Sequence, residues 1–244
     1  DWSTGKIGWN GYKSSIDYPV LSNPDDSRLW TGNSRVVGAE MLDVLGHGGY
    51  ALGARSQQIE KNLLAREQFN EQDLLDIQND DRALFLTPWH KFLSEQVMTT
   101  NFIEDNALQP LKTFIDEWQG RAAVESVSYL FVRTFRFSLR DKVFASINDL
   151  LESKTTDKQL KLNLRPLRHQ LEVPLWQLVS KQPKHLFPEG YDSWQALFQQ
   201  TAIETYNELV TTYGSIENAT WGAKNTTKIQ HPLSKAIPAL NWLL

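Results

Sequence analysis

The longest regular pattern in the chain lies between residues 122 and 151. Apolar residues recur there at intervals of three or four; they are Val124, Val127, Phe131, Phe135, Leu139, Val143, Ile147 and Leu150. Because an α-helix completes a turn every 3.6 residues, this spacing places their side chains on one face. The pattern therefore predicts one long amphipathic helix or two helices that follow each other directly.

Four basic side chains belong to the same predicted helix: Arg133, Arg136, Arg140 and Lys142. Such a row can bind phosphate groups, but the chain as a whole has a formal charge of −4 and a pI near 5.8. A protein that follows the phosphates of a nucleic acid needs a basic excess. We therefore expect no nucleic-acid partner, and we expect the basic side chains to pair with local carboxylates such as Asp141 and Asp149.

Other segments combine helical spacing with helix-capping residues. They cover residues 36–45, 51–67, 70–77, 84–97, 108–118 and 192–214. Nearer the N-terminus, two short apolar runs at residues 19–21 and 28–31 lie beside turn residues and predict strands. The expected fold is mainly α-helical with a few short N-terminal β-strands. We divide it into an extended or strand segment, residues 1–35, and a helical domain, residues 36–244.

The second predicted strand ends at Gly32 and Asn33. The carboxamide of Asn33 offers two N–H donors and no charge, so it could stabilise an oxyanion without taking part in proton transfer. An asparagine beside a glycine is also typical of a turn, because it tolerates a left-handed backbone. From spacing alone, both interpretations are open.

The order of motifs between Trp9 and Ile59 is more specific. It comprises Asp17-Tyr18-Pro19, Asn23-Pro24, Arg28-Leu29-Trp30-Thr31-Gly32-Asn33, Gly48-Gly49-Tyr50 and Gly53-Ala54-Arg55. This order resembles the penicillin amidase (penicillin acylase) family of N-terminal nucleophile hydrolases, which includes acyl-homoserine lactone acylases and cephalosporin acylases. A weaker similarity covers Trp221–Asn225 and His231–Ser234, which resemble an element late in the β subunit of that family.

The resemblance implies roles for individual residues. Asn33 matches the asparagine whose side chain contributes to the oxyanion hole, and Arg55 matches an arginine that helps to order the active site. Trp30 is our candidate for substrate binding, because tryptophan side chains can line an acyl pocket, although packing in a core is their commoner use. The nucleophile of the family is a serine at the N-terminus of the β subunit, with its own α-amino group as base, whereas this sequence begins Asp1-Trp2-Ser3.

We therefore expect a middle piece of a β subunit, part of an α+β (αββα) hydrolase, that is inactive by itself. The intact parent would hydrolyse an amide of the penicillin, cephalosporin or acyl-homoserine lactone type. Its partners would be the α subunit and the rest of the β subunit from the same precursor. We expect no cofactor, although calcium is possible in the intact parent, no membrane partner, and a location in the bacterial periplasm. His47, in a glycine-rich loop, has no role in the family, and we expect none here.

Two alternatives are kept open. The chain could be a non-catalytic helical module for protein interactions, in which the turn at Gly32 and Asn33 is only structural. Arg55 could also serve a structural purpose by pairing with a carboxylate such as Asp43 or Glu40, because a cation near a helix N-terminus opposes the helix dipole.

Overall fold

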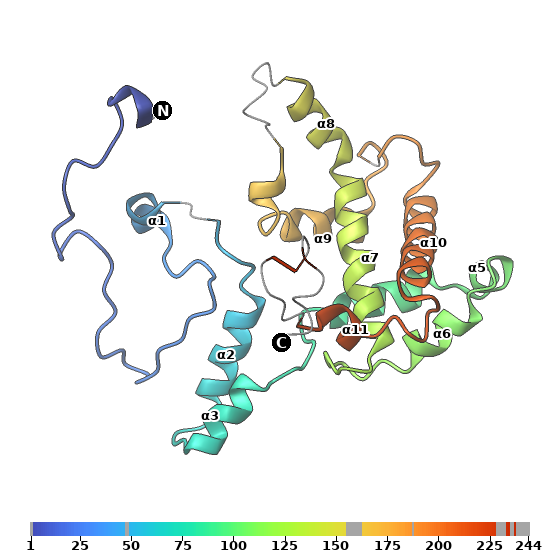
Figure 1. Ribbon diagram of the computed structural model, residues 1–244, viewed down its shortest axis with the longest axis horizontal. Helices are drawn as coiled ribbons and strands as arrows, with labels where there is room; N and C mark the ends of the chain where they lie inside the picture. The colour runs from blue at the N-terminus through green and yellow to red at the C-terminus, as the bar shows by residue number, and fades with distance from the viewer. Residues whose placement is uncertain are drawn as a thin grey trace. The chain divides into compact units, whose positions relative to one another are not determined.

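A computed structural model describes residues 2–46, 49–154, 163–186, 188–227, 233–234 and 237. By its packing, the chain divides into two compact units, whose helices are labelled in Figure 1. Unit 1 comprises Asp1–Asp80 and Asn163–Val173, and unit 2 comprises Asp81–Leu162 and Pro174–Leu244. The predicted division at residue 35 rests on the place of Asn33 rather than on packing, and it stays a prediction.

Unit 1 contains short helices joined by long extended stretches. They are η1 (Trp2–Thr4), α1 (Ala39–Leu45), α2 (Ala54–Leu64), α3 (Glu71–Gln78) and η3 (Arg165–Leu167). α3 begins with a capping box, in which the Asn70 side chain accepts from the Asp73 N–H and the Asp73 carboxylate accepts from the Asn70 N–H. α1 ends at Gly46, which has a φ of 81°. Both ends agree with the helices predicted from the sequence.

The strands predicted at residues 19–21 and 28–31 are wrong. In the described residues of unit 1, backbone pairing of the β type is limited to a single parallel bridge between Ser34 and Ala51. Val20 and Leu21 are each 68% exposed. A strand needs the N–H and C=O groups of a neighbouring segment. The turn residues and apolar runs indicate where a strand could form, but they contain no information about its partner.

Unit 2 contains most of the helices. They are α4 (Thr87–Phe92), the π-helical turn η2 (Leu93–Val97), α5 (Thr100–Asp105), α6 (Gln109–Asp116), α7 (Val127–Val143), α8 (Ala145–Ser153), most of α9 (Glu172–Lys181), α10 (Trp194–Tyr213) and α11 (Trp221–Asn225). The predicted helix at residues 192–214 corresponds to α10, which the Ser193 side chain caps and Gly214 ends with a φ of 85°.

The long apolar pattern forms two consecutive helices, α7 and α8, with Phe144 at the junction. α7 begins where the Ser126 hydroxyl accepts a hydrogen bond of 3.1 Å from the Tyr129 N–H, which satisfies one of the free donors of the first turn. Of the two arrangements that the sequence allowed, the second is therefore correct.

The core of unit 2 forms where α7 packs on α10. Phe131 and Phe135 on α7, with Leu197 and Phe198 on α10, are completely buried. Burying a side chain of this size contributes roughly 1.5–3 kcal/mol relative to leaving it in water. Aromatic rings extend the core: Phe92 lies edge-on to Phe198, with ring centroids 4.9 Å apart. Unit 2 thus has the hydrophobic centre that a stable helical domain requires.

Candidate oxyanion site

The turn at Gly32 and Asn33 lies against the beginning of α2 in unit 1. Asn33 has a φ of 60°, a left-handed conformation that asparagine tolerates better than most residues. Its carbonyl accepts a hydrogen bond of 2.8 Å from the Ala51 N–H, next to the bridge between Ser34 and Ala51. The backbone of Asn33 is therefore fixed, while its side chain is exposed.

Gly32 is buried, and its lack of a side chain allows a close approach to α2. A Cβ atom at this position would lie 3.1 Å from both the backbone N and the Cβ of Ser56. Such a distance is shorter than ordinary van der Waals contact, so a larger residue would force the turn away from the helix. Gly32 thereby determines how near Asn33 comes to the first turn of α2.

Arg55 in that first turn contacts both residues of the turn. Its Nη2 donates to the Gly32 carbonyl at 2.9 Å and also to Oδ1 of Asn33. In the described part of the chain, its partners are these oxygens and not the carboxylates of Asp43 or Glu40. The structure thus brings together Asn33 and Arg55, the two residues for which the sequence predicts catalytic roles.

This contact decides which end of the carboxamide is free. Because the guanidinium has no acceptor, it must bind Oδ1, and the Nδ2 group then keeps both of its N–H donors. A hydrogen bond from a cation to Oδ1 also polarises the amide and makes its N–H groups stronger donors. Chemically, the pair can offer oriented N–H groups to an anionic oxygen. Neither side chain supplies a nucleophile.

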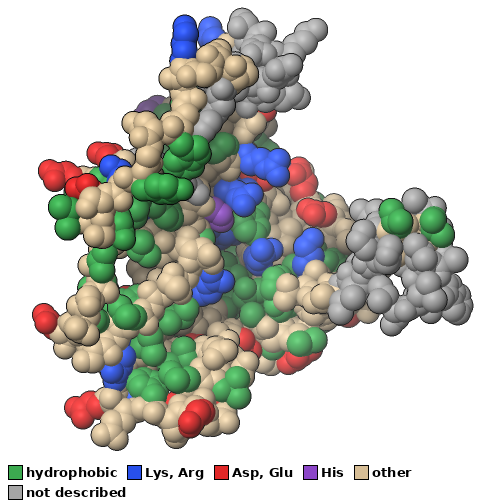
Figure 2. Space-filling view, turned by 60° about the vertical axis from the view of Figure 1, so that its left-hand side comes forward, with side chains coloured by type: hydrophobic (Ala, Val, Ile, Leu, Met, Phe, Trp, Pro, Cys, Tyr) green, Lys and Arg blue, Asp and Glu red, His purple; other side chains and the backbone are tan. Residues whose placement is uncertain are grey.

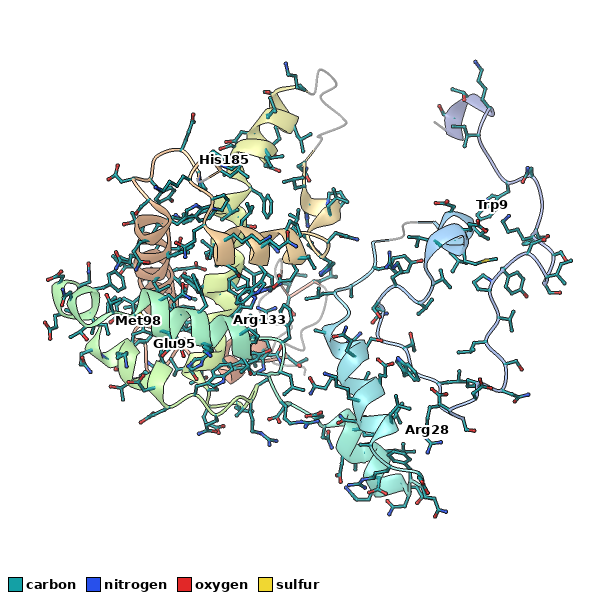
Figure 3. All side chains as sticks on the ribbon, turned by 180° about the vertical axis from the view of Figure 1, so that it is seen from behind. Trp9, Arg28, Glu95, Met98, Arg133 and His185 are labelled. Atoms are coloured by element: carbon teal, nitrogen blue, oxygen red, sulfur yellow. The ribbon has the colours of Figure 1, made fainter. Side chains whose placement is uncertain are left out.

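Arg28 makes a second contact with α2, which the sequence did not reveal. It is labelled in Figure 3, beside the far end of α2, where its guanidinium donates to the carbonyls of Leu63, Arg66 and Glu67 at 3.4, 3.2 and 2.5 Å. These oxygens lie in or just beyond the last turn of α2, where carbonyls lack helical partners. The segment from Arg28 to Asn33 therefore contacts α2 at both ends. Arg28 binds carbonyls at the C-terminal end of the helix, and Arg55, at its N-terminal end, binds Gly32 and Asn33.

For the other candidate residues, the structure shows only where they lie. Trp30 is half-buried and lies three residues before Asn33; its role in substrate binding stays a prediction. Trp221 lies in unit 2, on α11. His47 and His231 lie outside the described residues, and of the segment His231–Ser234 the structure describes Leu233 and Ser234.

A metal site and a membrane span were also sought. Among the residues that the structure describes, no three His, Cys, Asp or Glu side chains gather closely enough to hold a metal ion. None of the described helices has the length and apolar character needed to cross a bilayer.

The chain was compared with curated proteins and with models of protein families. A search of curated proteins found no match. The family model described as "Penicillin amidase" matches residues 1–242, which is nearly the whole sequence and includes the turn at Asn33, Arg55 and all of the described helices. This match agrees with the resemblance of the motifs between Trp9 and Ile59, and the chain belongs to the penicillin amidase family.

Proposed function

We propose that this chain supplies the oxyanion donor of an amidohydrolase that cleaves a linear acyl amide. The observation that carries the proposal is the contact of Arg55 with both Gly32 and Asn33. It fixes the Asn33 carboxamide with its N–H donors free, which is the arrangement that stabilises the negative oxygen of a tetrahedral intermediate. Membership of the penicillin amidase family supports the reaction class.

The attacking group in this proposal comes from another segment. Asn33 and Arg55 are donors and cannot attack a carbonyl carbon, so the reaction needs a nucleophile with a base beside it. The family resemblance suggests an N-terminal serine whose α-amino group accepts the proton, together with a backbone N–H as the second oxyanion donor. The 244-residue chain alone would then be inactive, and its partners would be the other parts of a processed precursor.

The substrate would be a small amide of the penicillin, cephalosporin or acyl-homoserine lactone type, with Trp30 in the wall of the acyl site. We place the protein in the periplasm as part of the same proposal. The absence of cysteine is compatible with that oxidising compartment. No step of the proposed reaction involves a cofactor.

The proposal is tested by the change Asn33→Gly in the full-length precursor. Glycine adopts a positive φ without strain, so the turn should persist while the carboxamide is lost. We expect kcat on chromogenic acyl anilides to fall about 100- to 1000-fold, as for other losses of one oxyanion donor. KM and the thermal midpoint should change much less.

Asn23→Gly is the matched control, because Asn23 is also a left-handed asparagine in unit 1, with a φ of 49°. It should leave kcat unchanged. A processed wild-type enzyme that hydrolyses none of the anilides would contradict the amidase function. A processed Asn33→Gly enzyme with full turnover would instead contradict only the role of Asn33.

A further inference from the structure

The basic row on α7 meets different partners along its length. Arg140 pairs with Asp141 at 2.6 Å, as predicted, and Lys142 pairs with Glu204 of α10 at 2.7 Å. For Arg133 the prediction is wrong as far as the described residues go: none of their carboxylates pairs with it, and its guanidinium lies over aromatic rings instead. Its Cζ atom is 4.8 Å from the centroid of Phe137 and 5.2 Å from that of Trp221.

Four side chains form this Arg133 cluster: Tyr129, Arg133 and Phe137 from α7, and Trp221 from α11. The α7 residues are four apart and therefore share one face of the helix. Trp221 lies beside them because its backbone N–H donates to the Ser126 carbonyl at 2.9 Å, just before α7 begins. The rings of Tyr129 and Trp221 meet edge to face, 4.9 Å apart. Arg133 is labelled in Figure 3, among the side chains of unit 2.

Two hydrogen-bond donors in the cluster find no acceptor among the residues that the structure describes. In the part of the chain that the structure describes, the Arg133 guanidinium has no carboxylate or carbonyl partner, and the Tyr129 hydroxyl has no hydrogen bond. Burial raises the pKa of Tyr129, so its phenol keeps its proton at neutral pH. Burial lowers the pKa of Arg133, but a guanidinium stays protonated in proteins.

The surroundings distinguish these donors from an ordinary surface charge. Both side chains are half-buried, so their groups have lost part of their hydration while remaining accessible. Cation–π contacts with Phe137 and Trp221 restrict the guanidinium, but these contacts do not use its N–H groups as hydrogen-bond donors. A ligand that fits needs acceptor oxygens, one negative charge and an apolar body that can lie against aromatic rings.

We propose that the Arg133 cluster binds a small aromatic carboxylate. The carboxylate would accept two parallel N–H bonds from Arg133, the geometry that guanidinium and carboxylate share, and one O–H bond from Tyr129. The aromatic body would pack on Trp221. Two other arginines lie over the Phe137 ring, but Arg140 is paired with Asp141 and Arg136 is buried. A ligand at the surface would therefore meet the single guanidinium of Arg133, which matches a monoanion better than a phosphate dianion. The inference does not depend on the proposed amidase activity.

The test uses the full chain and benzoate as the probe. Benzoate is titrated into the protein by isothermal calorimetry, while the indole N–H resonance of Trp221, assigned with Trp221→Phe, is followed by NMR. We expect saturable binding with one benzoate per chain and a shift of that resonance at the same concentrations. Arg133→Gln should weaken binding about ten- to hundredfold, the range expected when a hydrogen bond to a charged group is lost.

Three further variants make the result specific. Arg133→Lys keeps the positive charge but cannot donate two parallel N–H bonds, so it should bind benzoate more weakly than the wild type. Tyr129→Phe removes the O–H donor and should lower the affinity a few-fold. Arg121→Gln removes the same charge from an arginine of unit 2 that already pairs with Asp81, and it should bind benzoate normally. Non-saturable heats, or equal affinities of wild type and Arg133→Gln with unchanged near-ultraviolet circular dichroism, would overturn the proposal.

Discussion

At the scale of single residues, the turn at Asn33 joins a backbone requirement to a chemical one. A left-handed backbone restricts the position to glycine or a short polar residue such as asparagine, and the contact with Arg55 needs a side-chain oxygen. Asparagine meets both requirements, whereas glycine meets only the first. The two interpretations that the sequence left open, turn residue and oxyanion donor, are therefore compatible with each other.

Gly222 is a second position where the missing side chain matters. An added Cβ would lie 2.5 Å from Cγ1 and 2.8 Å from the carbonyl oxygen of Val124, which accepts the Gly222 N–H. Gly222→Ala should therefore lower the free energy of unfolding by about 1–3 kcal/mol, the usual cost of overpacking. Urea unfolding measures this change. Gly53→Ala is the control, because a Cβ there meets nothing within 4 Å.

The same substitution connects stability to the Arg133 cluster. Trp221 precedes Gly222, so a displacement of α11 would move its ring away from Arg133. We expect Gly222→Ala to weaken benzoate binding as well. Unchanged stability in Gly222→Ala would mean that α11 can shift without cost, and the packing argument would then be wrong.

At the scale of elements, polar contacts link α7 and α10 beside their apolar contact. We call the residues that make them, Lys142, Glu204 and Tyr191, the clamp. Lys142 Nζ donates to Glu204 at 2.7 Å and to the Tyr191 hydroxyl at 2.8 Å. Burial alone would lower the pKa of Lys142, but the bonds to Glu204 and Tyr191 outweigh it, and the pKa is raised. Burial likewise opposes the charge on Glu204, yet its bonds with Lys142 and Gln200 leave the pKa lowered.

These shifts predict how the clamp responds to pH. A lowered Glu204 pKa stabilises the fold above the ordinary value of 4.5, and this stabilisation is lost as pH falls through the lower folded value. A raised Lys142 pKa stabilises the fold below pH 10.5, and this stabilisation is lost as pH rises through the higher pKa of the folded state. The stability difference between wild type and Lys142→Met should thus be largest near neutral pH and shrink below pH 4.5.

Thermal unfolding from pH 3 to pH 8 measures that difference. Because half of the Glu204 side chain is solvent-exposed, we expect at most about 1 kcal/mol at neutral pH. Lys112→Met is the control, since Lys112 forms its ion pair with Asp116 of the same helix, α6. A difference for Lys142→Met that stays constant with pH would show that the loss comes from packing of the Lys142 stem.

The elements also separate what the sequence could predict from what it could not. α7, α8 and α10 follow from apolar periodicity and local caps, which involve residues at most four apart. The strand predictions failed because a strand needs hydrogen-bond partners from a segment that is distant in the sequence. Arg28 was missed for the same reason: the carbonyls that it binds are 35 to 39 residues away. Arg55 was found only through the family resemblance, since its local pattern fitted a carboxylate pair equally well.

At the scale of the whole molecule, the two units differ in how much apolar surface they bury. Unit 2 has a core of completely buried aromatic and aliphatic side chains. In unit 1, large apolar side chains of the N-terminal stretch are exposed to solvent, including those of Tyr12, Ile16 and Leu21. Hydrophobic side chains are open to solvent on the face drawn in Figure 2. Apolar surface that is exposed in this way is typical of a segment that another chain covers; under the proposed function, the rest of the precursor does so.

This contrast predicts where a protease cuts the isolated chain first. Chymotrypsin should cleave after Tyr12, which is fully exposed in an extended stretch, long before it reaches Phe131 or Phe135 in the core of unit 2. Mass spectrometry of the earliest products identifies the site, and Tyr12→Ser should delay that cut while leaving later ones unchanged. In the processed full-length protein, the same bond should resist cleavage, because the covering chain holds it. First cuts within α7 or α10 would mean that unit 2 is the looser part, and equal cleavage at Tyr12 in both forms would mean that no other segment covers the N-terminal stretch.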